Sequence, residues 1–198
     1  MLLNKQTSGS PCESTSEFAL ELMAARRTVL PKRLVAPGPD HAQLRVMLAA
    51  AATAPDYRQI LPWRFVLVQE AGRARLADVF AESLLERDRH ASTDQLERAR
   101  AKAFRSPCLM LVVCRTGGPP EDVSASERLI SAGCAIQNVL LHVTAMGFSS
   151  ALTSGKAMRS RAVRRLFDLS EFEDALVFVN IGTALSQLRP IDHMSTNT

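Results

Sequence analysis

The sequence has few aromatic side chains: they make up 5% of its 198 residues and include a single Trp and a single Tyr. It contains no run of about 18 uninterrupted apolar residues, so no membrane span is predicted. No block of five or six like charges stands alone, and the formal net charge is +4. That mild excess suits anionic small molecules as well as nucleic acid and decides little between them.

The four cysteines include no C-x-x-C pair, which leaves a zinc ribbon or a thioredoxin-type motif without support. Cys108 and Cys114 lie in an apolar run, and Cys134 lies in an apolar helical segment. We expect these three to be buried and reduced, because a free Cys packs as a small hydrophobic residue. Reduced thiols fit a cytoplasmic location, and the apolar stretch at the N-terminus is too short for a secretory signal.

The overall composition is that of a globular protein, with 46% hydrophobic and 22% charged residues. A chain of this length can bury a core without disulfides or metal ions. We expect a single domain over residues 14–186. A loosely ordered arm over residues 1–13 precedes it, and a polar tail over residues 187–198 follows it.

Three capping-box spacings, starting at Ser14, Asp40 and Ser124, indicate helix N-termini. The apolar spacing predicts helices over residues 14–28, 40–53, 72–89, 96–104, 126–146 and 158–167. The helix over residues 96–104 is expected to carry its Arg and Lys side chains outward. The helix over residues 126–146 is apolar almost all round, which is typical of a helix buried in the middle of a protein. Gly147 is well placed to end it.

Residues 63–68, 108–114 and 175–181 are rich in β-branched and apolar residues and are predicted to be strands. The run over residues 108–114 is continuously apolar, so we expect that strand to be buried on both faces. Three strands are too few for a large open sheet. Either the sheet gains strands elsewhere, or it is small and heavily wrapped by helices. The pattern favours an α+β domain with a long buried central helix.

The familiar catalytic motifs are missing: there is no Gly-rich phosphate loop, no G-x-S-x-G and no H-E-x-x-H. Cys134 and His142 are eight residues apart on a predicted helix, about 12 Å along its axis, which is too far for a thiolate–imidazole pair. We therefore predict no catalytic side chain and no metal site. An enzyme of this kind usually has its reactive atom on a cofactor.

Two segments could hold such a cofactor. Arg26-Arg27-Thr28 places two guanidinium groups and a hydroxyl at a helix end, a donor set that suits phosphate; the arginines could equally be there to complement the helix dipole. The segment over residues 54–63 contains the only Tyr and the only Trp and leads into a strand. It could bring an aromatic ring against a planar ligand, or it could simply cover the core.

The chain resembles the nitroreductase family in a series of short motifs, which occur in this order: Arg26-Arg27-Thr28, Ala54-Pro-Asp56, Pro62-Trp63-Arg-Phe65, Ser131-Ala-Gly-Cys134, Gly147-Phe148, Thr153-Ser-Gly155 and Ile181-Gly-Thr183. The resemblance covers about residues 16–186 and is closest to the small NAD(P)H nitroreductases of the family. It implies an α+β fold with a central, mainly antiparallel sheet wrapped by helices. It also implies a homodimer with FMN at the subunit interface.

By this resemblance the protein is an FMN-dependent NAD(P)H oxidoreductase. NAD(P)H is the co-substrate, and hydride passes through flavin N5 to nitroaromatic- or quinone-like acceptors in a ping-pong sequence. The residues that correspond to FMN-binding positions are Arg26, Arg27, Thr28, Thr53, Tyr57, Leu152, Thr153 and Ser154. Arg26 corresponds to the phosphate ligand, and Thr53 and Tyr57 correspond to contacts made across the interface. Leu152, Thr153 and Ser154 correspond to a Trp-Arg-Ser stretch that closes over the flavin.

Two of these positions depart from the family pattern, because Thr53 and Thr153 stand where relatives have arginines. Each lost charge-assisted bond would weaken flavin binding by about 10- to 100-fold. Tyr57, where relatives have His, could compensate by stacking. The departures leave open a second interpretation, a flavin-binding carrier or sensor with little reductase turnover.

The basic segment over residues 156–165 suggests a third interpretation, a nucleic-acid-binding domain. Its arginines, however, lie opposite an apolar stripe, as expected of a solvated helix face. The predicted partners are therefore a second copy of the chain and a small-molecule electron acceptor, with no nucleic acid and no membrane.

Overall fold

The computed structural model describes residues 11–185, so most of the predicted arm and all of the predicted tail lie outside it. Its helices are α1 (Pro11–Ala25), α2 (His41–Ala51), α3 (Glu70–Leu85), α4 (Thr93–Arg100), α5 (Ala125–Ala145) and α6 (Arg161–Leu166). Four short 3-10 helices are η1 (Pro31–Arg33), η2 (Tyr57–Gln59), η3 (Ala101–Phe104) and η4 (Lys156–Arg159). The strands are β1 (Leu34–Val35), β2 (Trp63–Leu67), β3 (Cys108–Arg115), β4 (Ser149–Thr153) and β5 (Glu173–Ala184).

The five strands form one antiparallel sheet with β5 near its middle. Along one edge β5 pairs with β3, which in turn pairs with β2. Along its other edge β5 pairs with β4 and then, at its C-terminal end, with β1. The 12 residues of β5 make it long enough to serve all three neighbours. The sheet therefore has β4 at an edge, and this edge positions the candidate site.

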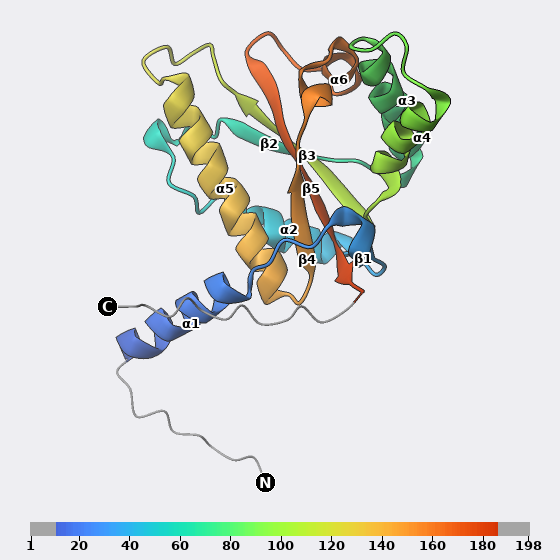
Figure 1. Cartoon of the computed structure of the whole chain (residues 1–198). Coiled ribbons are helices and arrows are strands. Elements are labelled where there is room, and N and C mark those ends of the chain that lie inside the picture. Colours follow the sequence, from blue (N-terminus) through green and yellow to red (C-terminus); the bar gives the residue numbers. More distant parts are fainter. Residues whose placement is uncertain (1–10, 186–198) are drawn as a thin grey trace, which may run out of the picture.

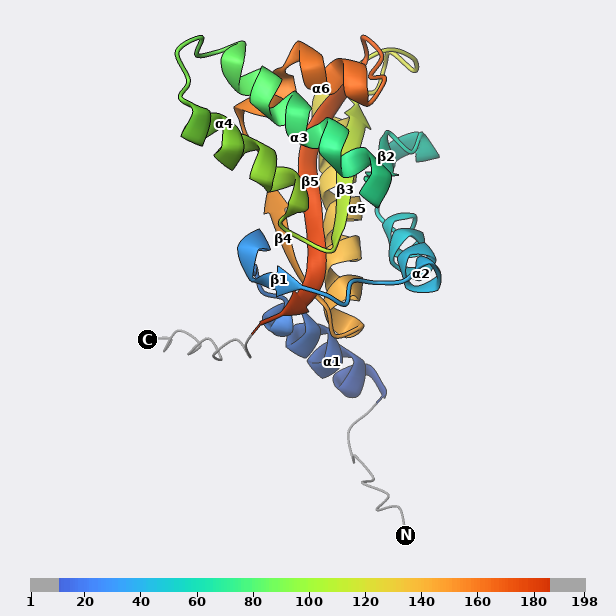
Figure 2. The same cartoon turned by 90° about the vertical axis from the view of Figure 1, so that its right-hand side faces the viewer.

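Helices cover both faces of the sheet (Figure 1). α2 and α5 pack on one face, around a core that includes Met47, Val112 and Val139. α3 packs on the other face over Leu111 and Phe178, with α4 and α6 beside it (Figure 2). β3 contributes to both cores, and all of its residues except the last are buried. The prediction that this strand is buried on both faces is confirmed, as is the α+β class with its mainly antiparallel sheet.

Local helix signals in the sequence were partly correct. The capping boxes at Asp40 and Ser124 are both formed and begin α2 and α5. The one predicted at Ser14 is wrong, because α1 begins at Pro11 and Ser14 lies inside it. A further capping box at Ser92 begins α4 three residues before its predicted start, and sequence reasoning missed it.

Two strands escaped prediction. β1 is only two residues long and lies in the proline-rich connector before α2. β4 has the sequence Ser-Ser-Ala-Leu-Thr, which carries no β-branched residue before its final Thr. It is a strand because five of its backbone positions pair with the free edge of β5. Tertiary pairing has therefore decided a segment whose own residues favour a loop.

α5 is the longest helix, but it is buried along one side only. Ala132, Val139 and Val143 are fully buried against the sheet, whereas Leu129 is 42% and Ile130 67% exposed. The expected C-terminal glycine is confirmed: Gly147 has a φ of +81°. The N–H groups of Gly147 and Phe148 bond back to the carbonyls of Thr144 and Val143, closing a Schellman motif. In the described part of the chain, no helix has both the length and the apolar character needed to cross a bilayer.

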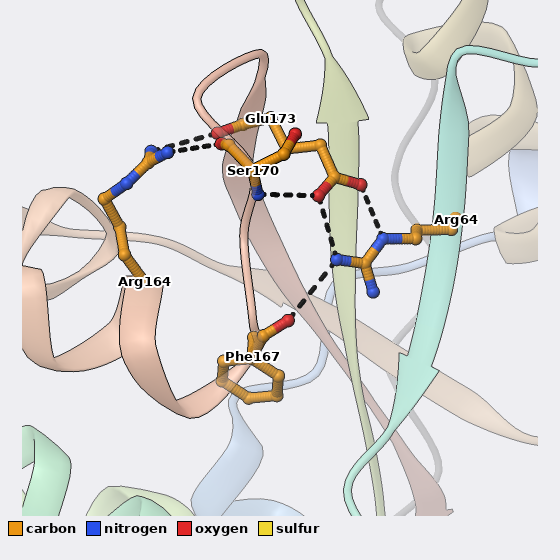
Figure 3. A network of polar contacts seen from close by, with 5 residues as sticks. All are labelled: Arg64, Arg164, Phe167, Ser170 and Glu173. Carbon is orange, nitrogen blue, oxygen red and sulfur yellow. Dashed lines mark hydrogen bonds and ion pairs between the residues drawn. The ribbon is translucent and has the colours of Figure 1, made fainter.

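A polar network ties the start of β5 to β2 and α6 (Figure 3). Arg64 donates through Nε to Glu173 Oε1 at 2.7 Å and through Nη2 to Glu173 Oε2 at 3.1 Å. The same carboxylate accepts the N–H of Ser170, and Arg164 donates to the backbone carbonyls of Ser170 and Glu173. The bonds that the Glu173 carboxylate accepts lower its pKa below the usual value, chiefly the hydrogen bond from Arg64.

Glu173→Gln should lower the free energy of unfolding by about 1 kcal/mol at pH 7, since Arg64 is partly exposed and screened. The lowered pKa means that the folded state holds Glu173 charged more strongly than the unfolded state does. The stabilisation is therefore present above the unfolded pKa, near 4.5, and is lost as the pH falls through the folded value. Urea unfolding of both proteins between pH 7 and pH 3 should show the difference shrinking below about pH 4.5. A difference that stays constant over this range would contradict the assignment.

Candidate functional site

A pocket of about 500 Å³ opens between the end of β4, η4 and the helices α3 and α4. We call it the basic pocket. Its apolar lining consists of Pro31 and of side chains from the core on the α3 face of the sheet: Phe80, Leu84, Ala99, Leu109, Ala157, Met158 and Phe178. Five cationic side chains also line it: Arg87, Arg98, Lys102, Arg105 and Lys156. Two residues predicted from the sequence, Thr153 and Ser154, lie in its wall.

The charged side chains that line the basic pocket are all positive. No Asp or Glu lines it. Among residues 11–185, none of its five cations makes an ion pair, and Arg87 is held only by a bond from Nε to the carbonyl of Ser83 at 3.1 Å. By contrast, the neighbouring Arg100 pairs with Asp78 and Glu97. The pocket combines an apolar surface with uncompensated positive charge, which suits a planar anionic ligand.

Thr153 is oriented by a buried amide. Its Oγ1 accepts a hydrogen bond at 2.9 Å from Nδ2 of Asn180, which is 2% exposed. Asn180 also donates to the carbonyl of Ala151, and its Oδ1 lies 3.1 Å from the Ser106 hydroxyl. Since the amide occupies one lone pair of Thr153 Oγ1, the hydroxyl hydrogen stays available to a ligand in the pocket.

A second pocket, of about 400 Å³, lies on the other side of β4, and we call it the edge pocket. It is lined by Arg26, Thr28, Gln137, Leu140, Ser150, Ala151 and Leu152. α1 ends at Ala25, and the chain then runs beside β4: Thr28 forms a parallel bridge with Ser150, and the Val29 N–H bonds to the Ser150 carbonyl at 3.0 Å. This pairing places Arg26 and Thr28 at the sheet edge.

β4 connects the two pockets. Ser150 to Leu152 line the edge pocket, and Thr153 and Ser154 line the basic pocket. From Ser150 to Ser154, five residues in all, the extended chain spans roughly 13 Å. An elongated ligand with an aromatic ring at one end and a phosphate at the other could therefore contact both pockets along this edge. The structure thus brings five of the eight predicted site residues to one strand edge.

The other three predicted residues line neither pocket of their own chain. Arg27 is half-buried beside Arg26. Thr53 is exposed next to α5, where its Oγ1 accepts from Nδ2 of Asn138 at 3.0 Å and donates to the Ala50 carbonyl. Tyr57 is 54% exposed, with the Arg58 guanidinium carbon 5.8 Å from its ring centroid. Any contact of Thr53 or Tyr57 with a cofactor stays a prediction about a second subunit.

The loop that carries Tyr57 has an unusual backbone. Arg58, Gln59 and Leu61 all have positive φ angles, of 60°, 52° and 45°. Asp56 supports this path, because its Oδ2 accepts the Leu61 N–H at 2.6 Å. The side chains of Tyr57 and Leu61 are left exposed to solvent. Three residues in a conformation that L-amino acids seldom adopt indicate that the loop shape is constrained.

Sequence reasoning missed the cations of the basic pocket. It placed Arg98 and Lys102 on a solvent-facing helix surface, and both are indeed exposed, but they also line the pocket. The i, i+4 spacing of two cations on one helix face was the available signal. The segments that face them, around Arg87 and Lys156, are far away in the sequence, so only the fold reveals the cluster.

The two cysteines of β3 are poor nucleophiles. Cys108 and Cys114 are buried thiols, as expected, and burial raises the pKa of each to about 11. A thiol with such a pKa is protonated at neutral pH and reacts poorly. Cys134 is half-buried and carries a free thiol as well. In the described part of the chain, the pocket linings therefore supply hydrogen-bond donors and positive charge.

Comparison with known proteins finds one protein family and its members over most of the chain. The sequence model of the Nitroreductase family matches residues 23–183. The chain is 32% identical over 167 residues to "Putative NAD(P)H nitroreductase YdjA" of Escherichia coli K12, covering 83% of this chain and 87% of that protein. It is 30% identical over 169 residues to "Putative NAD(P)H nitroreductase" of Haemophilus influenzae, covering 85% of this chain and 90% of the other.

Solved structures share the fold at low sequence identity. A nitroreductase-like family protein from Bacillus cereus superposes with a TM-score of 0.74 at 18% identity, covering 95% of this chain and 91% of that one. The FMN-dependent nitroreductase NfnB from Mycobacterium smegmatis, solved in complex with NADPH, gives a TM-score of 0.67 at 17% identity. That comparison covers 86% of this chain and 89% of NfnB.

Proposed function

The chain belongs to the nitroreductase family of oxidoreductases, and from this we propose that it is an FMN-dependent NAD(P)H oxidoreductase that reduces nitroaromatic- or quinone-like acceptors. The observation that carries the proposal is the strand edge of β4. It lines one pocket with an apolar surface and unpaired cations, and a second with a guanidinium and a hydroxyl. The solved relative NfnB, an FMN-dependent nitroreductase bound to NADPH, supports the choice of cofactor and co-substrate.

The residues present fit FMN. The apolar side chains of the basic pocket offer a surface for the flavin ring, and the Thr153 hydroxyl and the Lys156 ammonium offer donors to its polar edge. Arg26 and Thr28 in the edge pocket offer the donor set that phosphate prefers. Leu152 in β4 and Ser154 directly after this strand flank Thr153, and Arg27 adds a positive charge beside Arg26.

Bound FMN would supply the redox chemistry, accepting hydride from NAD(P)H at N5 and passing it to the acceptor in a ping-pong sequence. The chain would bind and orient the reactants. Lys156, which follows β4 and lines the basic pocket, would stabilise negative charge that develops near the flavin, because a preorganised cation does so without rearranging. No side chain of the two pockets needs to act as a general base. These features do not test the cytoplasmic location, which stays a prediction.

A homodimer would complete the site. Ile130, Gly133 and Gln137 follow one another along the exposed face of α5, and Gln137 lines the edge pocket. Gly133 costs about 1 kcal/mol in a helix interior relative to Ala, yet a Cβ there would meet nothing within 4 Å. This chain's own packing does not require the glycine. The close approach of a second subunit would explain it and would bring that subunit's Thr53 and Tyr57 to the site.

Ile130→Asp should convert the dimer into a monomer and reduce FMN retention, because it replaces an exposed apolar side chain of the proposed interface by a charge. Light scattering during size-exclusion chromatography measures the mass, and the ratio of 450 nm to 280 nm absorbance measures bound FMN. Leu85→Asp is the matched control: Leu85 is 40% exposed on α3, which lies on the other face of the sheet. An Ile130→Asp protein that remains dimeric would exclude α5 as the interface.

The function is tested by purifying the protein and recording its visible spectrum, before and after titration with FMN. We expect a yellow protein whose bound flavin is bleached anaerobically by NAD(P)H and reoxidised by a nitroaromatic compound. A protein that binds no FMN contradicts the proposal. A protein that binds FMN without being bleached supports the alternative, a flavin carrier or sensor. Thr53 and Thr153, which replace arginines of relatives, motivate that alternative.

A further inference from the structure

We infer that the basic pocket selects co-substrates that carry a carboxylate or a phosphate, and that Arg98 and Lys102 are its specificity-determining residues. The inference rests on the proposed function and names the substrate class of that same site. Its basis is an excess of positive charge over what the cofactor requires. Of the two residues, Arg98 comes from α4 and Lys102 from the following 3-10 helix.

The cofactor phosphate does not account for the cations. Its proposed ligands, Arg26 and Thr28, lie in the edge pocket, on the other side of β4 from the cluster. One phosphate neutralises at most about two positive charges. Besides Lys156, which is assigned to the flavin, the basic pocket holds four cations and no carboxylate. A site of this charge favours a second anion in addition to the flavin phosphate.

The arrangement of the cations also favours a ligand that enters from solvent. Arg87 follows α3, Arg98 and Lys102 lie along α4 and η3, and Lys156 opens η4. These segments surround the pocket, and all of these side chains are exposed at its rim. The apolar floor beneath them, including Leu109 and Phe178, lowers the local dielectric and strengthens their attraction for an anion.

Two co-substrates could supply the anion. One is the hydride donor, whose NADPH form carries a 2′-phosphate that NADH lacks. The other is an acceptor with a carboxylate on its aromatic ring. Both present the same chemistry to guanidinium and ammonium groups, so the two sources are separated by experiment, with matched charged and neutral compounds.

The test compares the wild type with an Arg98→Gln/Lys102→Gln double variant. Steady-state kinetics use 4-nitrobenzoate against 4-nitrobenzyl alcohol as acceptor, and NADPH against NADH as donor. We expect the KM for the anionic member of at least one pair to rise about 10-fold, with kcat and the KM for its neutral or less charged counterpart changed less than 2-fold. A rise for 4-nitrobenzoate identifies the acceptor, and a rise for NADPH identifies the donor.

The control is Arg75→Gln/Arg161→Gln, which removes the same charge from exposed positions that line neither pocket. It should leave all four KM values within 2-fold. The dissociation constant of FMN, measured by fluorescence, should stay within 2-fold in both double variants. A loss of FMN affinity in the Arg98→Gln/Lys102→Gln protein would overturn the inference, since the two cations would then serve the cofactor.

Unchanged or equally raised KM values for charged and neutral compounds would also overturn the inference, while leaving the oxidoreductase proposal intact. If the wild type shows no turnover at all, the proposed function fails separately. Calorimetric titration with 4-nitrobenzoate and 4-nitrobenzyl alcohol then still decides whether the pocket prefers the anion. Equal affinity for the two compounds counts against it.

Discussion

Arg26→Ala should weaken FMN binding by about 10- to 100-fold, the loss expected when a charge-assisted hydrogen bond to phosphate is removed. Arg26 is the guanidinium of the edge pocket, where Thr28 supplies the neighbouring hydroxyl. The effect should be large here because Arg26 is the one cation among the described residues that line the edge pocket. The dissociation constant is measured by the quenching of FMN fluorescence on titration with apoprotein.

Arg33→Ala is the matched control. Arg33 is an exposed guanidinium in η1, seven residues further along the chain, and lines neither the basic nor the edge pocket. Its removal should change the dissociation constant less than 2-fold. If both variants bind FMN as tightly as the wild type, the phosphate is not bound in the edge pocket. If both lose affinity equally, Arg26 acts only through the net charge of the protein.

The elements that the sequence predicted correctly are those with a strong local pattern. β3 is a continuous apolar run, and α2 and α5 begin with capping boxes whose partners are three residues apart. Each of these signals depends on neighbours in the chain and is independent of the rest of the fold. β1 and β4 lack such a signal, because their strand geometry comes from pairing with β5.

The residues of the candidate site also fall into two groups, those that a sequence motif revealed and those that only the fold brings together. Arg26, Thr28, Leu152, Thr153 and Ser154 were found through their resemblance to family motifs, and the structure places them on one strand edge. The cations of the basic pocket carry no motif. They converge because α3 and α4 pack against each other over the sheet, next to η4. The exposed face of α5 shows a further limit: the apolar pattern predicted burial all round, but the structure leaves Leu129 and Ile130 exposed, where the proposed second subunit would cover them.

Arg128→Met should lower the free energy of unfolding by about 3–5 kcal/mol. The Arg128 side chain is 1% exposed, and its guanidinium donates to backbone carbonyls at the end of β3 and in the loop before α5. The bonds reach Val123 at 3.0 Å, Gly118 and Pro120 at 2.7 Å each, and Arg115 at 3.5 Å. Methionine fills much of the same volume but leaves these carbonyls without donors, at about 1–3 kcal/mol for each one that stays buried.

Urea unfolding measures the effect at one fixed protein concentration, because a dimer's stability depends on concentration. Arg128→Lys keeps the charge but lacks the planar fork that serves several carbonyls at once, so it should lose about half as much. Arg75→Met, at an exposed position on α3, should change stability by less than about 0.5 kcal/mol. A stable Arg128→Met protein would mean that the loop finds other donors. The expected loss would instead show that the loop depends on Arg128, whose neighbours Leu129 and Ile130 begin the proposed interface.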